Sequence, residues 1–317
     1  MADDLVTRTV ATTMPKFIKK FQDAMANKAV EFYWAKNNDV MSYNNSGREI
    51  QWRVRLAEGT PSGWTGGLEE MTTAVRNDYQ VATAEWRGMM HNILVTKGEA
   101  MKCKKAEEII PLVATLLADM RNDLIEEFGT AWYSDGTRLS SKQFHGLGYS
   151  VVNSGTVYNI STTTYTNWAA QIITGTGFSA DPLNFLQQLE MACAVGQRGG
   201  RDRNQLDIFL CHKDEYQTVT QHETAKTRWT TNADMAKAGF KNIEVWGVPL
   251  AWSENCTADT IFGLNSNLFE FQCLGPDLFE TSTEWYQNPK VLVGAAHGMF
   301  QLLNKSPRGS GKINSIT

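Results

Sequence analysis

Residues 48–56, REIQWRVRL, alternate strictly between two kinds of side chain. The apolar side chains that would share one face are Ile50, Trp52, Val54 and Leu56. Period-two alternation over this length predicts a half-buried β-strand. The irregular stretch AEGTPSGWTGGLEEM follows, and a second extended run covers about Tyr79–Thr96. We therefore predict a long hairpin over residues 48–97 with an irregular tip.

This hairpin limits what the chain can do alone, because an isolated two-stranded ribbon is marginally stable in water. Long loops without secondary structure are also uncommon inside compact domains. The segment before the ribbon, residues 1–47, has apolar residues at helical spacing but is surrounded by polar sequence. Those apolar residues are Phe17, Ile18, Phe21 and Met25. We expect both the arm and the ribbon to pack on another body.

Residues 99–128 predict a long amphipathic helix, because apolar residues recur there at intervals of three and four. The stripe consists of Ile109, Leu112, Val113, Leu116, Leu117, Met120 and Leu124. Pro111 is expected to break or kink this helix or to open its second half. The helix is expected to end before Gly129.

The middle of the chain, residues 145–262, mixes predicted elements of both kinds. PLNFLQQLEMACAV and KDEYQTVTQHET read as helices, LDIFLC as a buried strand, and FKNIEVWGVPLAW as a hairpin that turns at Gly247. This alternation indicates an α/β or α+β domain. Residues 264–303 are mostly extended, and we expect them to return to the body built by the long helix.

Composition excludes several classes of function. The chain has 317 residues with a net charge of −4 and no long basic run, which argues against strong non-specific binding to nucleic acid. No run approaches the length of a membrane span. The cysteines are five in number and scattered, which favours free buried thiols in a reducing environment. Ten tryptophans suit buried contacts between chains.

The segment SDGTRLSSKQFHGLGYSVV, residues 134–152, gathers Asp135, Lys142 and His145 with hydroxyls and glycines. It lacks the G-x-S-x-G of a nucleophile elbow and holds only half of a dinucleotide fingerprint. Asp and Gly after a helix are typical of a turn with positive φ. We interpret the segment as a connector rather than a catalytic loop.

Three other motifs also have ordinary explanations. Cys211 and His212 are adjacent in a predicted strand, so their side chains would point to opposite faces. GQRGGRDRN, residues 196–204, lacks the phosphate-binding pattern, and GSGK near residue 309 has no helix after it. The histidines show no metal-binding spacing. We predict no catalytic residue, no cofactor and no metal site.

The order of the predicted elements resembles the major capsid proteins of tailed double-stranded DNA phages, which have the HK-97-like fold. SGREIQWRVRL, SGWTGGLEE and NDYQVATAEWR resemble the extended loop of that family. KAEEIIPLVATLLADMRNDLIEEFGTAWYSDGT looks like its spine helix and exit turn, and FHGLGYSVV like the entry to the axial domain. AGFKNIEVWGVPLAW and FGLNSNLFEF resemble the paired strands that end that domain.

The resemblance implies an α+β chain with an arm (1–47), an extended β-hairpin loop (48–97), a peripheral domain (98–144 and 264–317) and an axial α/β domain (145–263). It implies pentamers and hexamers that form an icosahedral shell around phage DNA, without sequence-specific binding. Such a shell belongs to the virion, is assembled in the host cytoplasm, and has a portal protein among its partners. The candidate intersubunit contacts that it implies are Arg53, Arg55, Trp64, Gly66 and Gly67.

Two departures from the family matter. Residues 48–95 contain no lysine, so the lysine–asparagine crosslink known in part of the family cannot use this loop. No long helical scaffolding segment precedes the arm, so we expect either a separate scaffolding protein or none; a decoration protein is a further possible partner. Two alternatives stay open, an encapsulin-type nanocompartment shell and a soluble α/β enzyme without a recognisable site.

Overall fold

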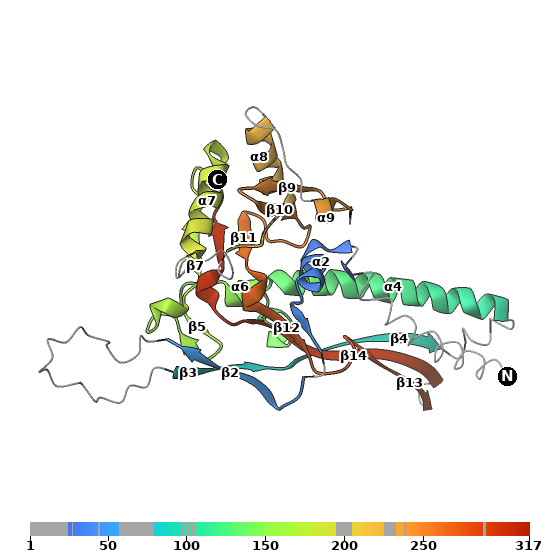
Figure 1. Cartoon of the computed structure of the whole chain (residues 1–317). Coiled ribbons are helices and arrows are strands. Elements are labelled where there is room, and N and C mark those ends of the chain that lie inside the picture. Colours follow the sequence, from blue (N-terminus) through green and yellow to red (C-terminus); the bar gives the residue numbers. More distant parts are fainter. Residues whose placement is uncertain are drawn as a thin grey trace, which may run out of the picture.

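The computed structural model describes residues 25–26, 28–43, 45–56, 79–96, 98, 102, 106–194, 205–224, 233–237, 239–287 and 290–317. Figure 1 shows two sheets, one above the other, with the long helix α4 (Ala106–Tyr133) lying along the lower one. Helices and strands are mixed along the chain, which confirms the predicted α+β class.

The lower sheet has five strands and is built around β14 (Lys290–Asn304). This strand pairs antiparallel with β12 (Phe269–Cys273) and β13 (Glu280–Gln287) along one edge and with β4 (Arg87–Thr96) along the other. The short β1 (Met41–Ser42) adds to β12 in parallel. The C-terminal strands β12 to β14 therefore return to the body of the long helix, as the sequence predicts.

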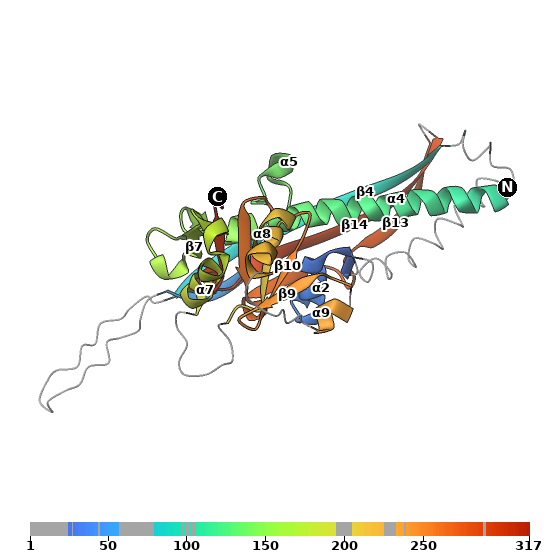
Figure 2. The same ribbon diagram turned by 90° about the horizontal axis from the view of Figure 1, so that it is seen from above.

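Helix α4 covers one face of this sheet, and Figure 2 shows it running alongside β4, β13 and β14. The predicted stripe is buried at Val113, Leu117, Met120 and Leu124, while Leu116 is only partly buried. These side chains are buried together because positions i, i+3 and i+4 share one face of a helix.

The predicted C-terminal boundary of this helix was wrong, because the helix continues beyond Gly129 to Tyr133. The helix also continues through Pro111, whose side chain is exposed, so the proline does not end it. A Cβ at Gly129 would come within 2.0 Å of Asn255 Nδ2, so this glycine serves close packing rather than helix termination. The last turn is retained because Ala131, Trp132 and Tyr133 are buried in the core.

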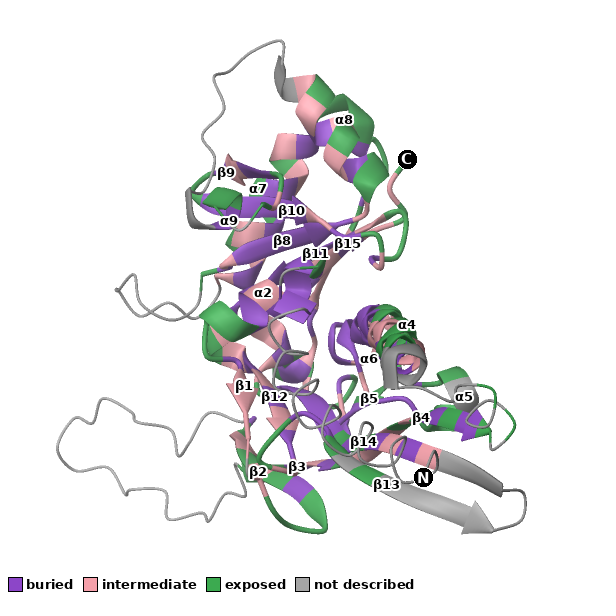
Figure 3. Cartoon of the chain, turned by 90° about the vertical axis from the view of Figure 1, so that its right-hand side faces the viewer, coloured by how far each residue is buried: buried purple, intermediate pink, exposed green. Residues whose placement is uncertain are grey.

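The upper sheet has six strands in the order β7, β15, β11, β8, β10, β9. Their bounds are β7 (Gln171–Thr174), β15 (Gly311–Asn314), β11 (Thr260–Leu264), β8 (Ile208–Cys211), β10 (Val248–Trp252) and β9 (Asn242–Val245). The helices α7 (Pro182–Cys193) and α8 (Lys213–Thr224) share a hydrophobic cluster with one face of this sheet. Figure 3 shows β8 fully buried and α8 exposed on its outer side.

Residues 311–314 differ from the expected division of the chain. We expected 264–317 to belong with the long helix, but β15 lies inside the six-stranded sheet between β7 and β11. Its glycine Gly311 permits this, because a Cβ there would approach Gln171 O to 2.5 Å. The C-terminal segment therefore contributes to both sheets.

The part of the arm that the structure describes belongs to the core, which corrects our expectation for residues 25–47. In α2 (Val30–Asn37), Phe32 packs edge-on against Phe128 and Trp132 of α4, with ring centroids 5.9 and 5.2 Å apart. Trp34 contacts Phe269 of the lower sheet. The predicted helical stripe of Phe17, Ile18, Phe21 and Met25 precedes α2, whose own side chains are buried on several faces rather than along one stripe.

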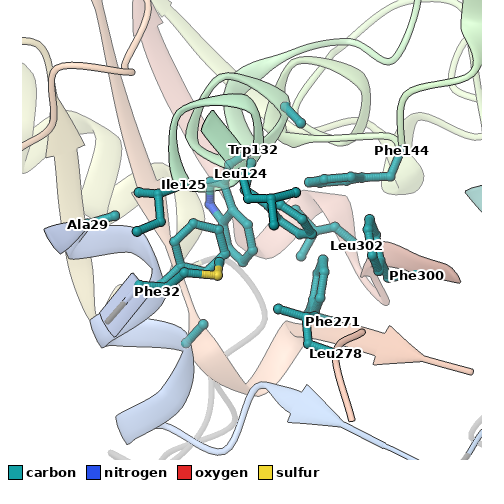
Figure 4. Packing of buried hydrophobic residues seen from close by; sticks show 14 of the residues in the cluster. Ala29, Phe32, Leu124, Ile125, Trp132, Phe144, Phe271, Leu278, Phe300 and Leu302 are labelled. Carbon is teal, nitrogen blue, oxygen red and sulfur yellow. The ribbon is translucent and has the colours of Figure 1, made fainter. Parts of the chain in front are cut away.

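An aromatic cluster fills the space between α4, α2 and the lower sheet (Figure 4). Phe128 is at its centre and touches Phe300 at 4.7 Å and Phe279 at 5.6 Å between ring centroids. Phe271 and Phe144 complete the contacts around it. Tilted and edge-to-face rings of this kind add to the stabilisation that comes from area burial alone.

One carboxyl group is buried beside this cluster. Glu31 of α2 has no exposed surface, and its Oε1 accepts a hydrogen bond from Asn255 Nδ2 at 3.4 Å. Burial raises the pKa of Glu31, while neighbouring polar groups, the Asn255 side chain among them, oppose the rise. The neutral carboxylic acid is therefore the form that the fold favours.

Substitution of Leu117 by alanine should lower the free energy of unfolding by about 2–5 kcal/mol, because it opens a cavity under α4. Leu116→Ala should cost less, because Leu116 is only partly buried. The exposed Asp119→Ala serves as the control and should be nearly silent. Urea unfolding of unassembled subunits measures all three. Equal losses for Leu116→Ala and Leu117→Ala would show that the helix has a different orientation.

Glu31→Gln should change how stability depends on pH. Because the folded pKa lies above the unfolded value of about 4.5, wild-type stability is complete below that value and declines as pH rises through the folded pKa. Glutamine carries no titratable proton, so the stability of the variant relative to the wild type should rise as pH increases from about 4.5 to the folded pKa of Glu31, and should then stay constant. Melting temperatures across this range measure the difference, and a constant gap would contradict a buried neutral Glu31.

Candidate intersubunit surfaces

The segment 134–152 is a connector, as its turn chemistry predicts. Asp135 Oδ1 accepts hydrogen bonds from the backbone N–H of Thr137 at 3.0 Å and from its hydroxyl at 2.6 Å, and Gly136 has a φ of +80°. His145 stacks on Tyr149 with ring centroids 3.9 Å apart. Burial, with a contribution from Arg87, lowers the pKa of His145 to about 4. The ring is therefore a neutral packing element at neutral pH.

The pair Cys211 and His212 lacks the features of a nucleophilic site. Cys211 is fully buried, and its thiol lies 3.6 Å from Ala251 O. Burial raises the pKa of this thiol well above its usual value, which disfavours the reactive thiolate. His212 faces Asp214 and Glu215 instead, with Nδ1 3.3 Å from Asp214 Oδ2.

No other chemical motif forms a site within the part of the chain that the structure describes. The described residues hold no group of three or more His, Cys, Asp or Glu side chains that could bind a metal. The loop 196–204 lies outside the described residues, and the glycines of GSGK allow close packing of β15. Among the described helices, none is long and apolar enough to cross a membrane.

The ribbon is shorter than predicted. β2 (Glu49–Arg55) pairs with β3 (Tyr79–Glu85) only, and the run that we expected to continue through Thr96 changes partner at Trp86. From Arg87 onward the chain is β4 of the lower sheet. The Trp86 indole Nε1 donates to Gly47 O at 3.1 Å at this crossing.

The inner face of the ribbon is supported by the chain itself, which corrects the expectation of external support. Ile50, Ala82 and Ala84 join a hydrophobic cluster with Tyr158 and Trp168. Tyr158 lies in the turn between β5 (Thr156–Val157) and β6 (Ile160–Ser161), a small hairpin beside the ribbon, and Trp168 follows β6. The base of the ribbon therefore packs against this small hairpin and against Leu303 of β14, rather than being a free element.

Tyr158 holds the base of the ribbon together, and no local sequence pattern indicated this role. Its hydroxyl donates to Leu302 O and accepts from the Asn304 N–H, each at 3.1 Å, and its ring packs edge-on against Trp52. The residue has a positive φ of 49°, a conformation that costs a bulky residue about 1–2 kcal/mol. Its fully buried ring and two hydrogen bonds offset that cost.

The outer face of the ribbon combines cationic and apolar side chains. Arg53 lies opposite Val81 and Arg55 opposite Tyr79, so the four share one face. Tyr79 and Val81 are 58% and 47% exposed, and both arginines are exposed. Arginine and tyrosine are enriched where protein surfaces meet. The candidates Trp64, Gly66 and Gly67 lie outside the described residues.

A second apolar surface lies on the face of the lower sheet opposite α4. On β4, Ile93 and Val95 are buried while Met90 and Leu94 are exposed by 66% and 58%. Met299 of β14, opposite Gly88, extends the same face and is 40% exposed. Exposed apolar side chains that cluster in this way mark surfaces for association.

The fold is that of shell-forming capsid proteins. The cyanophage A-1(L) capsid subunit is similar over 87% of this chain and 90% of its own length, with a TM-score of 0.62 and 15% identity. The capsid of an empty GTA particle is similar over 88% of this chain and 95% of its own, with a TM-score of 0.61 and 11% identity. The SrpI encapsulin of Synechococcus elongatus PCC 7942 is similar over 75% of this chain and 78% of its own, with a TM-score of 0.50 and 10% identity.

No protein-family model matches the sequence, and no curated protein does. The similarity thus lies in the fold, which is the α+β, HK-97-like architecture that the order of elements predicted. A fold shared at such low identity is retained through patterning and topology rather than through particular side chains.

Tyr158→Phe should lower the free energy of unfolding by about 1–3 kcal/mol, because it leaves Leu302 O and the Asn304 N–H buried without their partner. Tyr79→Phe removes the same hydroxyl from the exposed face of the ribbon and should be nearly silent. Urea unfolding of unassembled subunits compares the two. A neutral result at position 158 would mean that the ribbon base does not depend on this hydroxyl.

Proposed function

We propose that this protein is the major capsid protein of a tailed double-stranded DNA phage, a structural subunit without catalytic activity. The observation that carries the proposal is a match in fold to capsid subunits over 87–88% of this chain and 90–95% of theirs. The exposed ribbon face and the open sheet face support it, because both are apolar surfaces that a soluble monomer would not be expected to display.

In this proposal the subunits form pentamers and hexamers in a closed shell that encloses DNA in the virion, after assembly in the host cytoplasm. Arg53 and Arg55 contact a neighbouring subunit, and Trp64, Gly66 and Gly67 form the tip of the loop between β2 and β3. The division into an arm (1–47), an extended loop (48–97), a peripheral domain (98–144 with 264–317) and an axial domain (145–263) belongs to this proposal, with three changes that the packing requires. Val30–Asn37 and Arg87–Thr96 join the peripheral domain, and Gly311–Asn314 joins the axial domain. A portal protein is a partner, with separate scaffolding and decoration proteins as further partners.

An encapsulin-type compartment is the second candidate, because an encapsulin subunit shares most of the fold. The two functions differ in what the shell contains. A capsid should yield particles that hold double-stranded DNA when purified from phage-producing cells, whereas a compartment should hold a protein cargo. Electron microscopy of the particles, followed by extraction of their nucleic acid, decides between them. A protein that stays monomeric at high concentration would contradict both.

The double substitution Arg53→Glu with Arg55→Glu should leave the subunit folded but reduce particle yield at least about tenfold, as expected when interface hot-spot residues are replaced. Both side chains are exposed, so the subunit should keep its melting temperature. The matched control, Arg53→Lys with Arg55→Lys, retains the charge and should assemble. Particle yield is measured by size exclusion. An unchanged yield for the glutamate variant would show that these arginines do not belong to the interface.

A further inference from the structure

The turn between β9 and β10 contains an unusual residue. Val245 pairs with Val248, so Trp246 and Gly247 alone make the turn, and their φ angles are +54° and +85°. Two central residues with positive φ define the type I′ hairpin turn, in which Asn-Gly is strongly preferred. Gly247 suits this conformation, whereas a bulky residue at position 246 is a genuine outlier.

Tyr158 provides a comparison within the same molecule. Trp246 and Tyr158 are the two aromatic residues with positive φ among those described, and both come first in a two-residue turn. The ring of Tyr158 is 1% exposed and locks the ribbon base, so its strain is matched by contacts within the chain. Trp246 is 62% exposed, and no comparable burial within the described residues offsets its conformation.

A second exposed apolar side chain lies at the other edge of the same sheet. Met191 of α7 is 68% exposed. α7 packs on β7 and β15, whereas β9, which leads into Trp246, is the strand at the opposite edge of the six-stranded sheet. Figure 1 shows α7 and β7 to the left of this sheet and β9 with α9 (Ala233–Lys237) to its right.

We propose that Trp246 is an anchor between neighbouring copies of this chain and packs against Met191 of the next copy. The two surfaces differ, so the contact is head-to-tail, and a rotation from copy to copy closes such contacts into a ring. Tryptophan is enriched among the residues that dominate interface energies, and a methionine sulfur contacts aromatic rings favourably. The proposal rests on shell assembly as the protein's function and names one contact in it.

Trp246→Asn tests the proposal, because it should move two measurements in opposite directions. Asparagine suits the first position of a type I′ turn, so unassembled subunits should melt at the same or a higher temperature. Assembly should weaken, and the subunit concentration needed for half-assembly should rise by about tenfold or more. Trp246→Phe keeps an aromatic anchor and should stay close to the wild type in assembly.

The partner residue is tested with Met191→Ser, and Gln187→Ser, one turn away on the exposed side of α7, is the control. Met191→Ser should weaken assembly and Gln187→Ser should not. The double variant of Trp246→Asn and Met191→Ser should be little worse than the more severe single variant, because both remove the same contact. Light scattering of purified subunits against concentration measures every variant.

The outcomes separate this inference from the proposed function. A wild-type protein that never assembles would overturn the proposed function and the contact together. If the wild type assembles and the Trp246→Asn variant assembles equally well, the proposed contact is overturned while the proposed function stands. A lower melting temperature for Trp246→Asn subunits would show that the indole serves the fold of its own chain. Additive effects of the two substitutions would show that Met191 is not the partner.

Discussion

The contact between the last turns of α4 and the aromatic side chains of the lower sheet is the one on which the rest of the structure depends. Phe128 contacts Phe271 and Phe300 of the lower sheet, and Trp132 contacts Phe271. Both also contact Phe32 of α2. Tyr133, one residue further, contacts Phe262 of the upper sheet. A single stretch of helix therefore sets the positions of both sheets relative to each other, and α2 closes the space between them.

The polar residues at this junction follow from the same packing. Because α2 crosses between two apolar surfaces, Glu31 has no route to solvent and is held by Asn255 and its neighbours. Gly129 is required at the same place, because the Asn255 side chain occupies the space of a Cβ. A buried carboxyl and a helical glycine are both unfavourable in isolation, and the close approach of α4 to the upper sheet accounts for both.

The sequence predicted those helices and strands whose apolar periodicity continues over several residues. It did not predict strand partners or residue roles that depend on contacts far along the chain. The stripe of α4 and the alternation of β2 are visible because one face of each is buried. The change of partner at Trp86 is not visible, because the alternation continues through it while the neighbouring strand changes. The roles of Gly129 and Tyr158 depend on residues far along the chain, and local rules assign them to helix ends and turns instead.

The central position of β14 also bears on when the subunit can fold during synthesis. The lower sheet cannot form before β14 is made, because β4, β12 and β13 pair with this strand, and the upper sheet lacks an inner strand until β15 follows. Contacts of such long sequence range form slowly, and the domain folds as a unit. Neither sheet can therefore be completed while the C-terminal strands are still held in the ribosome. A subunit of this topology can therefore complete both sheets only after β14 and β15 have left the ribosome.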